Sequence, residues 1–188
     1  MKCYLGLVHH PVTNKKGEQV TTSVTNLDIH DIARSCRTFG IKKYFIITPL
    51  VLQHDLVDRI LNHWRSDSGS SYNPDRHEAL KTVHLVKSIA DAKENIQKTE
   101  QKTPLVAATG ASFSQNNGGM EKLLQRMRVD KVPCLLLLGT GWGLHPSIVE
   151  RADFCLRPIG YAKGDYNHLS VRSAAAIYLD RFRSAWEE

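Results

Sequence analysis

The sequence lacks any apolar run long enough to cross a bilayer, and its longest runs, such as 134–138 and 44–47, are short. It also lacks internal repeats and low-complexity tracts. The amino-terminal apolar stretch is not followed by a small-residue cleavage site, so it indicates a first strand and not a signal peptide. With 41% apolar and 23% charged residues, we expect one globular domain over residues 1–188, located in the cytoplasm.

Cysteine is scarce, and its spacing excludes two classes of small protein. None of the four cysteines forms a Cys-x-x-Cys pair: Cys3, Cys36, Cys134 and Cys155. A disulfide framework and a structural zinc site are therefore not expected. Among the nine histidines no two have the spacing that seats a metal on one helix face, and 76–80 lacks the second histidine of a zincin motif. We predict no metal and no membrane contact.

Charge is not concentrated in one dense block, although the formal net charge is +6. A basic surface steers polyanions and releases counterions from them, so this charge favours a nucleic-acid partner. It does not identify that partner.

β-Branched and apolar runs alternate with segments of helical period. Strands are predicted over 3–8, 44–48, 82–86, 105–108, 134–138 and 154–156. Helices are predicted over 27–39, 50–65, 88–99, 119–128, 146–152 and 169–186. Longer loops are expected over 11–19, 66–75 and 157–167, where long connections are commonly functional. The alternation predicts an α/β fold with a mostly parallel sheet flanked by helices.

The first candidate site is the run from Cys134 to Pro146, where an apolar strand meets Gly139-Thr140-Gly141-Trp142-Gly143. Glycines without a Cβ allow a ligand to lie directly against the main chain. At the carboxyl end of a parallel strand this pattern indicates a nucleotide-like site. A tight turn without a ligand is the alternative. The loop has neither the P-loop lysine nor the Gly-x-Gly-x-x-Gly of a dinucleotide fold, which favours a ligand without phosphate, such as S-adenosylmethionine.

A second candidate is Arg157-Pro158-Ile159-Gly160 followed by 165–176, a polar loop that enters a helix of small residues. Small side chains leave room for a ligand at the helix start, and Asn167 or His168 could cap it. An ordinary capped helix explains the same pattern.

A third candidate is the predicted helix at 26–40. Thr25 or Asn26 can cap it, Gly40 can end it, and Asp31 and Arg34 share one face. Acidic residues early and basic residues late also suit the helix dipole, so a purely structural role is open.

In this order the three segments resemble the three motifs of the SPOUT (trefoil-knot) superfamily of RNA methyltransferases. Within it, 25–31, 72–76 and 164–172 are similar to markers of a small bacterial group related to the tRNA guanine-N1 methyltransferase. The resemblance implies a C-terminal trefoil knot, which topology rules make rare. It also implies S-adenosylmethionine as cofactor, tRNA or rRNA as substrate, and a homodimer with active sites where the subunits meet.

The resemblance also assigns residues to roles. The expected cofactor contacts are Thr109, Leu138, Gly139, Thr140, Gly141, Gly143, Leu144, Arg157, Ile159, His168, Leu169, Ser170 and Val171. The expected catalytic residues are Arg34, Asp165, Asp28 and His168. Arg34 would fix RNA phosphate or orient the nucleophile, and Asp165 is the preferred base, with Asp28, Asp31 and His168 as alternatives. Further phosphate contacts are expected from Lys42, Lys43, Arg126, Arg128 and Lys163.

Four departures from the family pattern bear on the reaction. Ser170 replaces the asparagine of the third motif, and Arg172 stands where that motif has a serine. Asp28 stands where members that methylate the ribose 2′-oxygen have an asparagine, and the glutamate of the second motif is missing. Ribose methylation is thereby disfavoured. Two other functions stay open: a non-catalytic RNA-binding protein that keeps the knotted fold, and an unrelated α/β enzyme that binds nucleotide phosphates at 139–143.

Overall fold

The structure is a computed structural model that describes residues 2–65, 71–113, 115–160 and 166–187. Its strands are β1 (Cys3–Val8), β2 (Val12–Thr13), β3 (Gln19–Val20), β4 (Tyr44–Ile47), β5 (Val83–Val86), β6 (Leu105–Ala108), β7 (Cys134–Gly139) and β8 (Phe154–Cys155). Its helices are α1 (Asn26–Thr38), α2 (Val51–Arg65), α4 (Pro74–Leu80), α5 (Ile89–Glu100), α6 (Met120–Asp130), α7 (Pro146–Val149) and α8 (Val171–Glu187).

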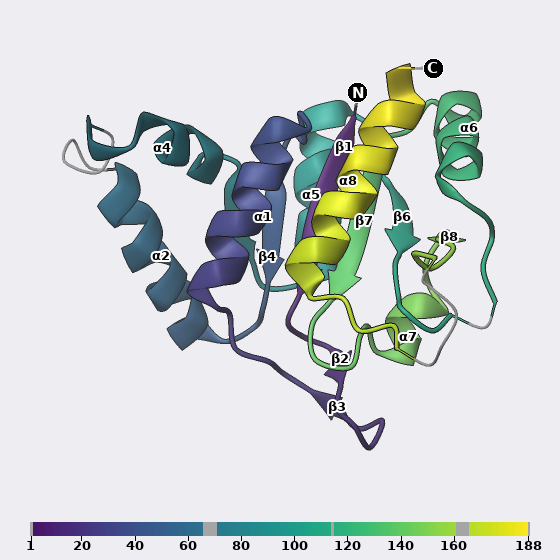
Figure 1. The fold of residues 1–188 in the computed structure, drawn as a ribbon, viewed down its shortest axis with the longest axis horizontal. Coiled ribbons are helices and arrows are strands. Elements are labelled where there is room, and N and C mark those ends of the chain that lie inside the picture. The colour runs from purple at the N-terminus through teal and green to yellow at the C-terminus, as the bar shows by residue number, and fades with distance from the viewer. Residues whose placement is uncertain (1, 66–70, 114, 161–165, 188) are drawn as a thin grey trace.

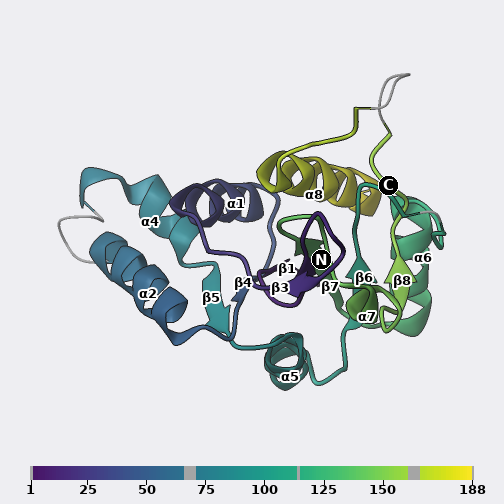
Figure 2. The same ribbon diagram turned by 90° about the horizontal axis from the view of Figure 1, so that it is seen from below.

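Six strands form one sheet in the order β5-β4-β1-β7-β6-β8, and every neighbouring pair in it is parallel. Because parallel strands need crossover connections, helices cover both faces. Helices α1 and α8 lie on one face and α5 and α7 on the other (Figures 1 and 2). The predicted α/β architecture with a mostly parallel sheet is therefore confirmed. The trefoil knot stays a prediction.

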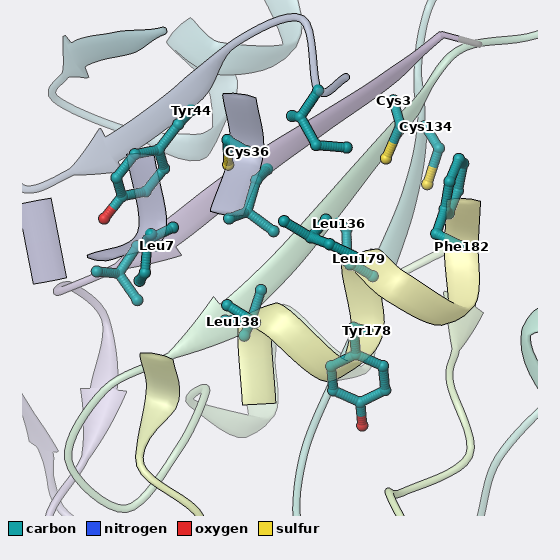
Figure 3. Packing of buried hydrophobic residues seen from close by; sticks show 14 of the residues in the cluster. Cys3, Leu7, Cys36, Tyr44, Cys134, Leu136, Leu138, Tyr178, Leu179 and Phe182 are labelled. Atoms are coloured by element: carbon teal, nitrogen blue, oxygen red, sulfur yellow. The ribbon is translucent and has the colours of Figure 1, made fainter. Parts of the chain in front are cut away.

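Side-chain alternation along the central strands divides the core into two layers. In β1, Leu5 and Leu7 belong to the layer under α1 and α8, whereas Tyr4 and Val8 belong to the layer over α5 and α7. Figure 3 shows the first layer, where Leu136 and Leu138 of β7 lie against the side of α8 that carries Tyr178 and Leu179. This packing fixes α8 over the middle of the sheet.

Besides shifts of one or two residues at the ends of several elements, the structure departs from the prediction in three places. The antiparallel hairpin of β2 and β3 begins in the expected loop 11–19 and ends at Val20, and α4 begins in the expected loop 66–75. Helix α7 ends at Val149, short of the predicted 152. No helix in the described parts of the chain is long and apolar enough to span a membrane.

The ends of α1 follow the predicted chemistry. The hydroxyl of Thr25 accepts a hydrogen bond from the backbone N–H of Asp28, as an N-cap residue should. Gly40 directly after the helix has φ +71°, the left-handed conformation that ends many helices. The motif at 26–40 is thus one complete helix.

Candidate functional site

The three predicted segments meet at the carboxyl edge of the sheet. Thr109 follows β6, and both its N–H and its hydroxyl donate to Leu137 O of β7, at 3.1 and 2.9 Å. After β8, Leu156 N–H donates to Ala108 O at 2.9 Å. Further along, the Asn167 side chain donates to Ala111 O at 2.9 Å. Segments far apart in the sequence are therefore tied together around the ends of β6 and β7.

The glycine loop follows β7 and is built from close backbone contacts. A Cβ on Gly139 would lie 2.4 Å from Leu144 N, so the chain can fold back on itself only because that atom is missing. Gly141 has φ +61°, and Gly143 N–H donates to Thr140 O at 3.0 Å, which closes a turn that needs glycine at its first central position. The loop is therefore a tight turn, and the predicted binding of a ligand to it stays a prediction.

The hairpin of β2 and β3 holds this loop in place, and sequence analysis missed it. Trp142 N–H donates to Thr13 O and Thr13 N–H donates to Gly143 O, each at 3.0 Å, while Val12 forms a bridge with Leu144. A signal was present in the sequence: Asn14 and Gly17 are turn-forming residues between two short β-branched pairs.

The third segment enters α8 with a different cap from the one predicted. Ser170 accepts a hydrogen bond from Ser173 N–H at 3.1 Å, so Ser170 caps the helix and Leu169 lies before it. Asn167 instead donates to the loop after β6, and His168 is exposed and contacts the Tyr166 ring at 5.2 Å between ring centres. Of the two predicted caps, neither has that role.

The predicted cofactor contacts differ in burial. Leu138, Leu144, Ile159 and Thr109 are buried. Leu138 and Ile159 belong to the core layer under α1 and α8, and Leu144 belongs to the layer over α5 and α7. The other described members are exposed or partly exposed: Gly139, Thr140, Gly141, Gly143, Arg157, His168, Leu169, Ser170 and Val171. Such a combination suits a ligand that lies on exposed main chain next to apolar side chains.

A chain of hydrogen bonds connects β1 to the glycine loop through His9. The Thr140 hydroxyl donates to Val8 O at 3.0 Å, so its oxygen must accept from the Thr22 hydroxyl next to it. Because the Thr22 proton is used in that bond, the Thr22 oxygen accepts from His9 Nδ1 at 3.0 Å. This order of donors assigns the proton of the neutral imidazole to Nδ1 and leaves Nε2 as an acceptor.

The environment of His9 agrees with that assignment. Its side chain is fully buried, and Nε2 has no hydrogen-bond partner among the described residues. Burial lowers the pKa of His9 from 6.5 to about 4, against the opposing effect of the Asp28 carboxylate. His9 continues the alternation that places Leu7 under α1, so it lies on the same face of the sheet as Asp28. The ring is therefore neutral at physiological pH.

Two of the departures from the family pattern lie against each other. Arg172 Nε in the first turn of α8 is 3.9 Å from Asp28 Oδ1, and Arg172 Nη1 is 3.6 Å from Asp31 Oδ2. Asp28 is 8% exposed, and its carboxylate also accepts the Thr25 hydroxyl at 2.6 Å. The first and third motifs thus share one ion-pair cluster.

The remaining predicted catalytic residues are not drawn together by the described structure. Arg34 is exposed on α1, and its charge is one of the influences that lower the pKa of His30, after burial and Arg76. Asp165, like Lys163, lies outside the described residues. Of the three expected catalytic residues that the structure describes, Arg34, Asp28 and His168, Asp28 alone has polar partners from both the first and third motifs.

Four of the expected phosphate contacts have partners within the chain. Lys42 and Lys43 precede β4, at the opposite edge of the sheet, where they bind Glu100 and Asn95 of α5. Arg126 donates to Asp153 O at 2.6 Å, and Arg128 donates to the last turn of α8 and lies over the Trp186 ring. The structure gives these four residues a structural role, and their contact with phosphate stays a prediction.

A cavity of about 460 Å³ lies beside the start of α6 and not at the glycine loop. Its lining is polar: Asn116, Asn117, Gly118, Gly119, Glu121, Lys122, Gln125 and Arg157. Arg157 is the one predicted cofactor residue in this lining. No group of three or more potential metal ligands occurs in the described residues.

Solved structures with this fold define the class of protein. The A. aeolicus TrmH/SpoU tRNA modifying enzyme aligns at TM-score 0.59 and 15% identity, over 99% of this chain and 76% of that one. TrmJ from Z. mobilis aligns at TM-score 0.62 and 13% identity, over 100% and 71%. An AdoMet-bound rRNA methyltransferase from Sinorhizobium meliloti aligns at 0.53 and 13%, over 97% and 56%. The fold is that of the SPOUT class, as the motifs predict.

Sequence comparison narrows the class to a family. The model of a SAM-dependent RNA methyltransferase family matches residues 2–184, and the chain belongs to this family. A tRNA (guanine-N(1)-)-methyltransferase of Oleidesulfovibrio alaskensis is 47% identical over 178 residues, which cover 95% of this chain and 41% of that protein. An uncharacterized protein of Aquifex aeolicus is 37% identical, over 96% of this chain and 88% of that protein. The chain spans about two-fifths of the length of the named tRNA methyltransferases that it matches.

Proposed function

We propose that the protein transfers a methyl group from S-adenosylmethionine to a tRNA or rRNA, as a homodimer of one knotted domain per chain. The observation that carries the proposal is the bare main chain of the glycine loop, fixed at the carboxyl edge of a parallel sheet. Membership of the family supports the activity. The named tRNA methyltransferase relative supports tRNA as the first substrate to test.

The residues present fit an adenosyl ligand. Among the described residues, no atom beyond the neighbouring residues of the chain lies within 4 Å of the position that a Cβ would occupy on Gly143, nor of that on Gly160, so the main chain of both segments is open on that side. The two segments also contain the buried apolar residues Leu138, Leu144 and Ile159. An adenine ring is bound by apolar contacts together with backbone donors and acceptors around it. We therefore propose that the cofactor binds between 109–113, 139–144 and the described parts of the third segment, 157–160 and 166–171.

When bound, S-adenosylmethionine supplies an activated methyl group on a sulfonium centre. The chain then has to position the RNA nucleophile and accept its proton. Asp28 and Asp31, both next to Arg172, lie at the end of α1 that packs beside the start of α8. Asp165 remains the preferred base, and Arg34 remains the proposed contact to RNA.

Calorimetry with S-adenosylmethionine and S-adenosylhomocysteine tests the cofactor. Binding of both supports the proposal. If correctly folded protein binds neither, the enzyme assignment fails and a non-catalytic RNA-binding protein takes its place. Tighter binding of ATP or NAD would instead favour an unrelated nucleotide-binding enzyme.

The substrate requires a separate experiment. RNA from cells with and without the gene is digested and compared by mass spectrometry, and one methylated nucleoside should disappear in the deletion strain. Purified protein should restore that nucleoside on RNA from the deletion strain. Light scattering on the purified protein tests the homodimer.

A further inference from the structure

Trp142 is a large aromatic side chain exposed at the turn of the glycine loop. It is 66% exposed, although burying an indole is among the larger apolar gains available to a folding chain. Its neighbours Gly141 and Gly143 have φ +61° and +105°, and the Cβ position of Gly143 adjoins open space. Tryptophan is enriched at interfaces, and the exposed indole beside the proposed cofactor site is available to a binding partner.

The backbone under Trp142 is held on both sides. The turn from Thr140 to Gly143 is closed by its own hydrogen bond, and β2 pairs with it through Thr13. Gly141 packs against the same strand, since a Cβ there would lie 3.0 Å from Thr13 O. The exposed indole is therefore carried by a turn whose backbone is held in one conformation. Because the turn is already ordered, binding loses less conformational entropy.

The hairpin that supports this turn carries two exposed cations. Its tip is a turn organised by Asn14, whose side-chain oxygen accepts from Lys16 N–H at 2.8 Å and Glu18 N–H at 3.0 Å. Lys15 and Lys16 are exposed there, and neither forms an ion pair within the described part of the chain. Figure 1 shows β2 and β3 below the carboxyl edge, beside the loop that leaves β7.

We infer that Trp142 is a stacking platform for an unpaired RNA base and that Lys15 and Lys16 bind phosphates of the same strand. The inference rests on the proposed function, because it takes RNA as the substrate, and it specifies which RNA fits. Aromatic side chains bind bases that are splayed out of a helix, and lysines alongside bind the backbone. The substrate region is therefore single-stranded, a loop or bulge, with purines preferred for their larger stacking surface.

Fluorescence anisotropy with labelled oligoadenylate, oligouridylate and a matched RNA duplex tests the platform. Loss of one stacked base corresponds to about 5- to 150-fold weaker affinity. Trp142→Ala should therefore weaken oligoadenylate binding by that factor and leave duplex binding unchanged. Trp142→Phe keeps an aromatic face and should stay within about threefold of the wild type. Tyr72→Ala removes another exposed aromatic residue, which precedes α4 in the chain and is not part of the glycine loop, and serves as the matched control.

The salt dependence of binding distinguishes stacking on Trp142 from phosphate binding by Lys15 and Lys16. Each phosphate contact to a single strand contributes about 0.7 to the slope of log affinity against log salt. The double variant Lys15→Ala/Lys16→Ala should lower that slope by about 1.4. Trp142→Ala should weaken binding without changing the slope, because stacking releases no counterion.

For each variant, calorimetry measures the affinity for S-adenosylhomocysteine and light scattering measures the oligomeric state. Equal affinity of Trp142→Ala and wild type for oligoadenylate, in protein that binds S-adenosylhomocysteine normally, overturns the platform and leaves the proposed function intact. A changed oligomeric state in Trp142→Ala assigns the indole to a subunit contact and also overturns it. Absence of S-adenosylhomocysteine binding in the wild type is a failure of the proposed function and is seen without any RNA.

Discussion

Arg172 in the first turn of α8 pairs with Asp28 in the first turn of α1, with 3.9 Å between Nε and Oδ1. Each residue departs from the pattern of the SPOUT motifs that it belongs to, and the structure places the two departures in contact. An asparagine and a serine would form a neutral pair here. The chain has a carboxylate and a guanidinium instead, and the charge of one compensates that of the other.

The geometry of this pair predicts a small contribution to stability. The Arg172–Asp28 distance of 3.9 Å and the Arg172–Asp31 distance of 3.6 Å are both long, and the Arg172 side chain is 31% exposed, so Arg172→Ala should change the free energy of unfolding by less than about 1 kcal/mol. Because the pair joins the first and third motifs, the same variant should lower methyl transfer by about tenfold or more. Urea denaturation and transfer of labelled methyl to RNA from the deletion strain measure the two effects.

A double-mutant cycle with Asp28→Asn and Arg172→Ser tests whether the two residues act as a unit. The double variant has the neutral residues of the motifs and should be more active than the Arg172→Ser single variant. Additive losses of activity would contradict a coupled pair.

Gly143 and Gly17 provide a matched test of the cofactor cradle. Both have positive φ, at +105° and +79°, and in the described structure neither has an atom from beyond its chain neighbours within 4 Å of the position that a Cβ would occupy. Alanine at either position should cost about 1–2 kcal/mol of stability through backbone strain. Only Gly143→Ala should also weaken S-adenosylhomocysteine binding, by about tenfold or more, because its methyl group enters the proposed site.

Calorimetry and denaturation of both variants give the comparison. Similar losses of stability with unequal losses of affinity place the ligand at Gly143. Equal affinities of the two variants would remove Gly143 from the cofactor site.

The sequence was sufficient to predict the strands of the sheet, because these strands are short apolar runs with clear ends. Strands β1 and β6 have the predicted bounds. The hairpin of β2 and β3 was missed because each strand has two residues, too few for an alternation to be recognised. Helix α4 was missed although Asn73 and Pro74 are a typical cap and first residue, because its seven residues give little periodicity.

The site was predictable only where it depends on main chain. Glycine spacing identifies the loop after β7, since the missing Cβ atoms are visible in the sequence itself. The contact of Arg172 with Asp28 depends on how α8 crosses α1, which no local pattern specifies. The same holds for His9, because its partner Thr22 reaches it through the hairpin.

His9 gives a prediction for the dependence of stability on pH. Its pKa is about 4 in the folded protein and 6.5 as a free side chain, so between these values the unfolded chain binds more protons. The free energy of unfolding should therefore fall as the pH falls from about 6.5 towards 4, by up to about 3 kcal/mol from this residue. The lowered pKa of His30 acts in the same direction.

Urea denaturation of wild type and His9→Gln over that pH range isolates the contribution of His9. The free energies of unfolding of wild type and His9→Gln should become more similar as the pH falls. Only the wild type loses stability to protonation at this position. His168→Gln, which changes an exposed histidine, serves as the control. A constant difference between wild type and His9→Gln across the range would show that His9 is not the group that titrates.

Replacing single carboxylates with asparagine tests whether Asp165 is the general base. Asp165→Asn removes the proton acceptor with little change in shape, so it should lower the turnover number about 10²- to 10⁴-fold. The affinity for S-adenosylhomocysteine should stay within about twofold of the wild type, because an asparagine preserves the size of the side chain. Asp180→Asn changes an exposed carboxylate on α8 and is the matched control. If Asp165→Asn keeps wild-type turnover while Asp28→Asn does not, the proton is accepted at Asp28, and the ion pair with Arg172 then has to open for the base to act.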